Sequence, residues 1–257
     1  MARLFDDGST EYLQIESAVV SAYPIGMGCL FNSNDDAVNQ VLMFVGDGGD
    51  ADRFINLRIA GNIAGDFLEA IARQDASAVK AITSAGYTAN TWHHAAGIWL
   101  AANERHAYLD RGNKGSNTDV ISAMANFDRT AIGAARDSSP GAYMSGHIAE
   151  AAIWDLTDWG GNDAAREVAF ELAIASMAKG YSPLHFPLGL LGYWLLVRGL
   201  NDRVGGFNMT ASGTVVSAHP RVIYPSKIWV PHISAAVGGS VPVIMQQMNQ
   251  FNGGMAA

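Results

Sequence analysis

The chain has 257 residues, of which 49% are apolar and 16% are charged, and its formal net charge is −8. The 16 basic residues are scattered without a Lys/Arg run, which argues against electrostatic binding to nucleic acid. No apolar run approaches the roughly 18 residues that a membrane span needs. Residues 1–8 lack a secretion-signal pattern, and the single cysteine, Cys29, excludes an intrachain disulfide framework.

Up to about residue 155, short apolar or alternating segments are separated by clusters of Gly, Asn and Asp. In residues 54–59, for example, Ile55, Leu57 and Ile59 share one face, which is the period of a half-buried strand. Strands are predicted at residues 12–15, 25–31, 38–45, 54–59, 67–74, 79–83, 93–99, 105–110, 130–134 and 147–154. Many short strands with frequent turn signals predict a mainly β chain, folded as an antiparallel sandwich or jelly roll.

The period then changes to that of a helix. Asn162 is a capping residue, Gly180 and Pro183 are stop signals, and the segment between them predicts one amphipathic helix over residues 163–178. Val168, Leu172 and Ala175 lie on one helical stripe and are expected to be its apolar side. Beyond the helix, strands are predicted at residues 190–197 and 213–216.

Residues 226–257 are predicted to leave the sandwich, which would span residues 1–225, as a C-terminal arm for assembly. Prolines 231 and 242 and the glycine pairs 238–239 and 253–254 disfavour a long helix or a central strand. Yet the segment carries large apolar side chains, which are expected to bury against another subunit: Ile228, Trp229, Val230, Met245, Met248 and Phe251. A surface with so little charge also favours self-association into a homo-oligomer.

Several segments resemble laminin-G-like domains of the concanavalin A-like jelly-roll type. The strand TWHHAAGIW (residues 91–99), the hairpin RHAYLDRG (105–112) and the run YMSGHIAEAAIWD (143–155) match the family's patterns in order, after an opening FDDGSTEY (5–12). The departures from the pattern, an extra Asp in the opening motif and Asp-Arg-Gly in the hairpin, fall at turns. The resemblance therefore implies the fold, and no metal or sugar site is carried over.

A narrower resemblance covers the region after the predicted helix. The segments GYSP (residues 180–183), GYWLLVRGLNDRVGG (192–206) and AHPRVIYP (218–225) are similar to laminin-G-like proteins encoded among the virion genes of tailed bacteriophages. This resemblance implies a virion setting and says nothing of chemistry.

No catalytic residue is predicted. Jelly-roll glucanases carry Glu-x-Asp-x-x-Glu on one strand, which places two carboxylates across the scissile bond. No such string occurs, and the nearest spacing, Glu11 to Glu16, has Leu13 in the middle position. Glu167 and Glu171, four apart on the predicted helix, are expected to form a solvated face.

Metal binding is weighed against simpler explanations. Asp47, Asp50 and Asp52 crowd one Gly-rich loop and are calcium candidates, although such loops are more often solvated turns. His93 and His94 are neighbours on a strand and point to opposite faces, so the pair cannot ligate one metal. In the resembled family one ring of such a pair is buried and hydrogen-bonded.

His106 and His147 lie on other predicted strands, where a cross-strand metal site has no spacing signature. Trp92, Trp99 and Trp154 are expected in the core, whereas Trp159 is expected to reach the surface, where it could stack on a sugar or contact a protein. No cofactor is predicted apart from the calcium candidates.

The leading hypothesis from these observations is a non-enzymatic virion protein, namely a capsid decoration or cement subunit of a tailed phage. Its partners would be copies of itself and other virion proteins such as the major capsid protein, without nucleic acid or a membrane. The alternative is a carbohydrate-binding, lectin-like module that recognises the host from a tail or spike.

Overall fold

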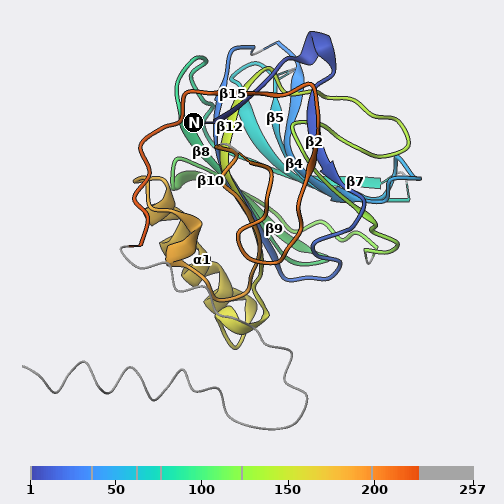
Figure 1. Cartoon of the computed structure of the whole chain (residues 1–257). Coiled ribbons are helices and arrows are strands. Elements are labelled where there is room, and N and C mark those ends of the chain that lie inside the picture. Colours follow the sequence, from blue (N-terminus) through green and yellow to red (C-terminus); the bar gives the residue numbers. More distant parts are fainter. Residues whose placement is uncertain are drawn as a thin grey trace, which may run out of the picture. The chain divides into compact units, whose positions relative to one another are not determined.

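The computed structural model describes residues 2–225, apart from Asp36, Asn62, Ala76, Ala123 and Arg198. Two antiparallel sheets form a sandwich, and one α-helix packs against the outer face of one of them (Figure 1). The predicted mainly β sandwich with one helix is therefore confirmed. No helix in these residues is long and apolar enough to cross a membrane.

The two sheets interleave in the sequence. The first sheet has the spatial order β10 (Gly112–Asn117), β9 (Glu104–Leu109), β8 (His93–Ala101), β3 (Ile25–Ser33), β12 (Gly146–Asp155), β1 (Ala2–Phe5) and β15 (Val215–Ser217), and β13 (Leu190–Trp194) also pairs with β12. The second has the order β14 (Thr210–Ser212), β2 (Tyr12–Ile15), β11 (Arg129–Ile132), β4 (Asn39–Gly46), β5 (Phe54–Ala60), β6 (Phe67–Gln74) and β7 (Ser77–Ile82).

Four strand assignments differ from the sequence pattern. The predicted strand 213–216 is confirmed only for residues 215–216, which lie in β15. Gly213, at φ +80°, instead belongs to the segment that separates β14 from β15, which are in different sheets. The sequence pattern predicts none of β1, β10 and β14. Strand β10 contains no large apolar residue, and pairing with β9 positions it.

The main core fills the space between the sheets. Phe5, Phe31, Leu57, Trp99 and Trp194 are among its fully buried side chains. Burying a large apolar side chain contributes roughly 1.5–3 kcal/mol, so this layer supplies most of the driving force for folding.

A second cluster lies between the first sheet and helix α1 (Asp163–Met177). The helix begins where the Asn162 side chain accepts a 2.9 Å hydrogen bond from the backbone N–H of Ala165. Its buried side chains are Phe170, Ala173, Ile174 and Met177, which pack among Ile98, Trp154, Leu190 and Tyr193. Gly26 on β3 makes room for this packing, because a Cβ there would lie 2.6 Å from the Phe170 ring.

The predicted apolar side of the helix is wrong. Val168 is 58% exposed and Leu172 is 68% exposed. The predicted apolar stripe and the stripe that is buried both have helical spacing. The buried stripe contains Phe170, which is bulkier than any residue of the predicted one. The predicted C-terminal arm and its six apolar residues lie outside the described residues.

Candidate functional site

Three connections between the sheets contribute to one depression in the surface. The 3-10 helix η1 (Asp7–Ser9), dark blue at the top of Figure 1, links β1 to β2, residues 34–38 link β3 to β4, and residues 133–145 link β11 to β12. Each passes from one sheet to the other. The depression has a volume of about 400 Å³ and is lined by Asp7, Val38, Asn39, Ala142 and Tyr143.

The polar side chains around this depression are unengaged. Within the described part of the chain, the Asp7 carboxylate, the Asn39 amide and the Tyr143 hydroxyl form no hydrogen bond or ion pair with the protein. The neighbouring Asp6 differs, because it accepts hydrogen bonds of 3.0 Å and 2.8 Å from the Gly8 amide and the Ser9 hydroxyl. The Asn39 Oδ1 is itself buried, so the Asp7 carboxylate, the Tyr143 hydroxyl and the Asn39 amide nitrogen are the groups free to meet a polar ligand.

The carboxylates of the acidic loop between β4 and β5 have protein partners, in the loop itself and on β6. Asp50 Oδ2 lies 3.2 Å from Arg53 Nε, and Asp52 Oδ1 lies 2.5 Å from Arg73 Nη2. Asp47 accepts a 2.8 Å hydrogen bond from the backbone N–H two residues further on. The predicted calcium ligands thus occupy one loop, but among the described residues they do not bring three ligand atoms together.

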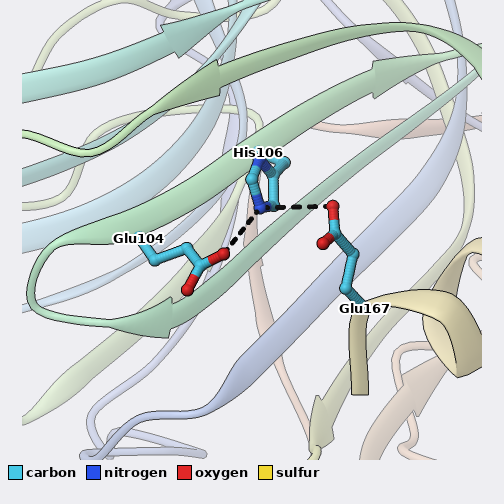
Figure 2. A group of neighbouring side chains, drawn as sticks. All are labelled: Glu104, His106 and Glu167. Carbon is cyan, nitrogen blue, oxygen red and sulfur yellow. Dashed lines mark ion pairs between the residues drawn. The ribbon is translucent and has the colours of Figure 1, made fainter. Parts of the chain in front are cut away.

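The first sheet and helix α1 do bring together a group that could hold a metal: Glu104, His106 and Glu167, whose ligand atoms all lie within 4.8 Å of one another. Glu104 and His106 are two apart on β9 and therefore point to the same side of the strand. Figure 2 shows the imidazole between the two carboxylates, with Glu167 reaching it from the helix.

The expectation that Glu167 and Glu171 form a solvated face is wrong for Glu167. Its side chain is only 17% exposed, and one of its oxygens contacts the Lys114 ammonium. The Tyr108 hydroxyl donates a 3.1 Å hydrogen bond to Glu171 and lies 3.4 Å from Glu167. Helix packing turns this acidic pair toward β9 and β10, which its spacing of four residues does not reveal.

Burial and charge act against each other in this cluster. Burial lowers the pKa of His106 and outweighs the opposing charge of Glu167, so the ring is neutral at pH 7. Burial also lowers the pKa of Lys114, but Glu167 and Glu171 raise it by more, so the lysine remains charged. The pKa of Tyr108 is raised by burial and by the same two carboxylates.

A second polar cluster surrounds the buried Glu150. This residue has φ +54° and lies at an irregularity of β12 between Ala149 and Ala152. Its carboxylate accepts hydrogen bonds from the hydroxyls of Tyr193 and Tyr224, the latter at 2.7 Å, and its Oε1 lies 3.1 Å from His219 Nε2. Burial, followed by the Glu150 charge, raises the pKa of both tyrosines. The cluster joins β12 to the chain after β15.

One ring of the His93–His94 pair is expected to be both buried and hydrogen-bonded, but in the structure each ring has only one of these two properties. The His94 ring is buried, and burial lowers its pKa to about 4, but its Nδ1 has no hydrogen-bond partner. The His93 ring is instead the hydrogen-bonded one, with Nδ1 2.7 Å from Asp110 Oδ2. The Asp110 hydrogen bond and charge outweigh burial and raise the pKa of His93.

The tryptophans also differ from expectation. Trp99 and Trp154 are fully buried as predicted, but Trp92 precedes β8 and is half-buried. Trp159 packs against Phe170, at 6.1 Å between ring centroids, and its Nε1–H donates a 2.8 Å hydrogen bond to the Leu188 carbonyl.

Residues 7–157, more than half of the chain, match the model of the concanavalin A-like lectin/glucanases superfamily, in its laminin-G-like branch. The chain belongs to this superfamily. A search of curated protein sequences found no match.

Solved structures share the fold at low sequence identity. A native heptameric SAP-like pentraxin from Limulus polyphemus is 11% identical, with a TM-score of 0.56, over 83% of this chain and 93% of the pentraxin. A candidate carbohydrate-binding protein from Bacteroides ovatus is 17% identical, with a TM-score of 0.54, over 84% of this chain and 60% of that protein. These similarities establish the fold alone.

Proposed function

We propose that the chain is a carbohydrate-binding domain whose sugar site is the depression over Asp7, Asn39 and Tyr143. The observation that carries the proposal is the combination of an aromatic ring, a carboxylate and an amide around a volume of about 400 Å³, none of them engaged by another described residue. Membership of a superfamily of lectins and glucanases supports it, as does the shared fold of the Bacteroides ovatus protein.

The chemistry of these side chains suits a sugar. An aromatic ring offers an apolar face for the C–H side of a pyranose, and its hydroxyl remains available for hydrogen bonding. The Asp7 carboxylate can accept hydrogen bonds from sugar hydroxyls, whereas the Asn39 amide nitrogen can donate one. A volume of about 400 Å³ lies at the small end of the 300–1,000 Å³ of typical ligand sites, which favours one or two sugar units.

The site is tested by a glycan array with the purified chain, followed by calorimetric titration of the best glycan. Tyr143→Ala and Asp7→Asn are each expected to weaken binding by about tenfold or more, because each removes a direct contact. Asp158→Asn, at an exposed aspartate of the 3-10 helix η2 (Thr157–Trp159), is the matched control and should bind normally. An array without any binder, or full affinity in Tyr143→Ala, would refute the proposal.

We propose further that this binding is not accompanied by hydrolysis. The chain lacks the paired-carboxylate string of the jelly-roll glucanases, and the depression has one lining carboxylate, Asp7. The measurement is reducing-sugar release from laminarin and from any glycan that the array identifies. Turnover that one Glu→Gln substitution abolishes would overturn this part of the proposal.

A second candidate function is that of a virion structural protein, such as a capsid decoration subunit of a tailed phage. It is favoured by the low charged fraction of 16%, by the phage-like segments at residues 180–225, and by the exposure of Val168 and Leu172 on α1. A decoration subunit would co-purify with capsids in stoichiometric amounts and would bind no glycan. A receptor-binding module would be scarce in the particle and would bind the array.

A further inference from the structure

The side chains of Glu104, His106 and Glu167 are spaced as the ligands of a metal ion would be. The His106 Nε2 lies 3.5 Å from Glu104 Oε1 and 3.3 Å from Glu167 Oε1. A tetrahedral zinc ion with ligand bonds of about 2.1 Å would hold neighbouring ligand atoms about 3.4 Å apart. Both distances from His106 Nε2 agree with this separation of ligand atoms. The three residues come from a strand and a helix that are distant in the sequence.

The histidine nitrogen in the middle of the group lies close to both carboxylates but forms no hydrogen bond. The His106 side chain is 6% exposed, and its Nε2 forms no hydrogen bond although two carboxylate oxygens lie beside it. The ring nitrogen is thus aimed at neither oxygen, and Figure 2 shows it between them. A buried polar atom without a hydrogen bond is costly, and an ion on the ring axis would satisfy it together with both carboxylates.

The other ring nitrogen is held as in known metal sites. His106 Nδ1 lies 2.8 Å from the Ser116 hydroxyl on the neighbouring strand β10. Metal-ligating histidines generally donate their second N–H to such an acceptor, which orients the ring and directs the lone pair of the first nitrogen to the ion.

The charge of the cluster also favours a divalent cation. Three carboxylates, Glu104, Glu167 and Glu171, face one ammonium, that of Lys114. Lys114 contacts the same Glu167 oxygen that an ion would use, but its side chain is 37% exposed and its Nζ lies 3.4 Å from Glu171. The lysine can therefore move to Glu171 when an ion arrives, and it competes with that ion.

We propose that Glu104, His106 and Glu167 bind a divalent transition-metal ion such as Zn²⁺ between strand β9 and helix α1. Histidine nitrogen and carboxylate oxygen are both zinc ligands, and three protein ligands would leave the fourth tetrahedral position open to water. Calcium prefers six to eight oxygens and is disfavoured by the imidazole. The bound ion would tie the helix to the sheet, at a site separate from the depression around Tyr143.

The test is calorimetric titration of ZnCl₂ into the full chain, freed of metal with a chelator and carrying no histidine tag. One Zn²⁺ per chain is expected, with binding at least about tenfold weaker in Glu104→Gln and in Glu167→Gln, because each removes a ligand. Lys114→Gln is expected to bind Zn²⁺ more tightly than the parent chain, because the competing ammonium is gone. Asp158→Asn, at an exposed aspartate outside the cluster, is the control and should retain the site.

A second measurement separates a built site from surface binding. Co²⁺ in a tetrahedral site absorbs visible light strongly, so the Co²⁺-loaded parent chain should show this absorption and Glu104→Gln should lose it. Glu104 is about one-third exposed, so this variant is expected to fold normally. Absence of Zn²⁺ binding would overturn the proposal, and so would a Zn²⁺ affinity of Glu104→Gln and Glu167→Gln equal to that of the parent chain. Binding of Ca²⁺ in preference to Zn²⁺ would also overturn it.

Discussion

The Tyr224 hydroxyl donates a 2.7 Å hydrogen bond to the buried carboxylate of Glu150. The last described residues of the chain are thereby joined to the centre of the first sheet, because β12, which carries Glu150, lies between β3 and β1. Tyr193 completes the arrangement, with its hydroxyl between Glu150 and Ser182.

Removal of the Tyr193 hydroxyl is expected to destabilise the protein. Tyr193→Phe leaves the buried Glu150 and Ser182 each short of a hydrogen bond, at a cost of about 1–3 kcal/mol. Urea unfolding measures the loss. Tyr12→Phe is the control, because the Tyr12 hydroxyl makes no hydrogen bond with the described residues, and it should change stability by less than about 0.5 kcal/mol. Equal effects of the two substitutions would contradict this account of the Glu150 cluster.

Helix α1 is expected to respond very differently to two neighbouring truncations. Phe170 is fully buried against the first sheet, so Phe170→Ala should cost about 3–5 kcal/mol. Leu172 is 68% exposed, so Leu172→Ala should remain within about 0.5 kcal/mol of the parent chain. Thermal or urea unfolding of the isolated chain distinguishes the two faces. A larger loss in Leu172→Ala would mean that another surface covers this side of the helix.

The free energy of unfolding is expected to decrease as the solution is made more acidic, because of His94. Burial lowers the pKa of His94 from 6.5 to about 4, so the folded state binds the proton less well than the unfolded state. The resulting contribution, on the order of 3 kcal/mol, is complete above pH 6.5 and is lost progressively as the pH falls toward 4. His94→Gln should therefore show a smaller loss of stability between pH 7.5 and pH 4.5 in urea unfolding. An identical loss in both proteins would assign the pH dependence to other groups.

The assembly role of the C-terminal residues is open to a direct test. A chain that ends at Tyr224 keeps the hydrogen bond to Glu150, so it should retain its β-sheet circular dichroism and melt cooperatively. If residues 226–257 serve assembly, this shorter chain should lose oligomerisation or capsid binding, as measured by sedimentation and co-purification. Failure of the shorter chain to fold would place these residues in the core and remove the assembly role.

The sequence by itself determines the sandwich. The alternating residues 54–59 become most of β5, because side chains of a strand alternate between the faces of a sheet. The predicted strand 38–45, which is apolar from Val41 to Val45, becomes most of β4. The motif of residues 91–99 likewise identifies the family and contains most of β8. The formation of these strands and the family motif depend on residues that are close together in the sequence, so sequence patterns are sufficient to predict them.

Only the tertiary structure decides the faces and the sites. Val168 and Phe170 each belong to an apolar stripe with helical spacing, so the sequence does not decide which stripe is buried. The space that Gly26 leaves on β3 is filled by Phe170, and the stripe of Phe170 is therefore the buried one. His106 carries no spacing signature, because Glu167 comes from the helix and meets it only when α1 packs across β9. The depression over Asp7, Asn39 and Tyr143 likewise combines three connections that the sequence separates. Pairings between distant segments depend on packing, which residue spacing does not encode.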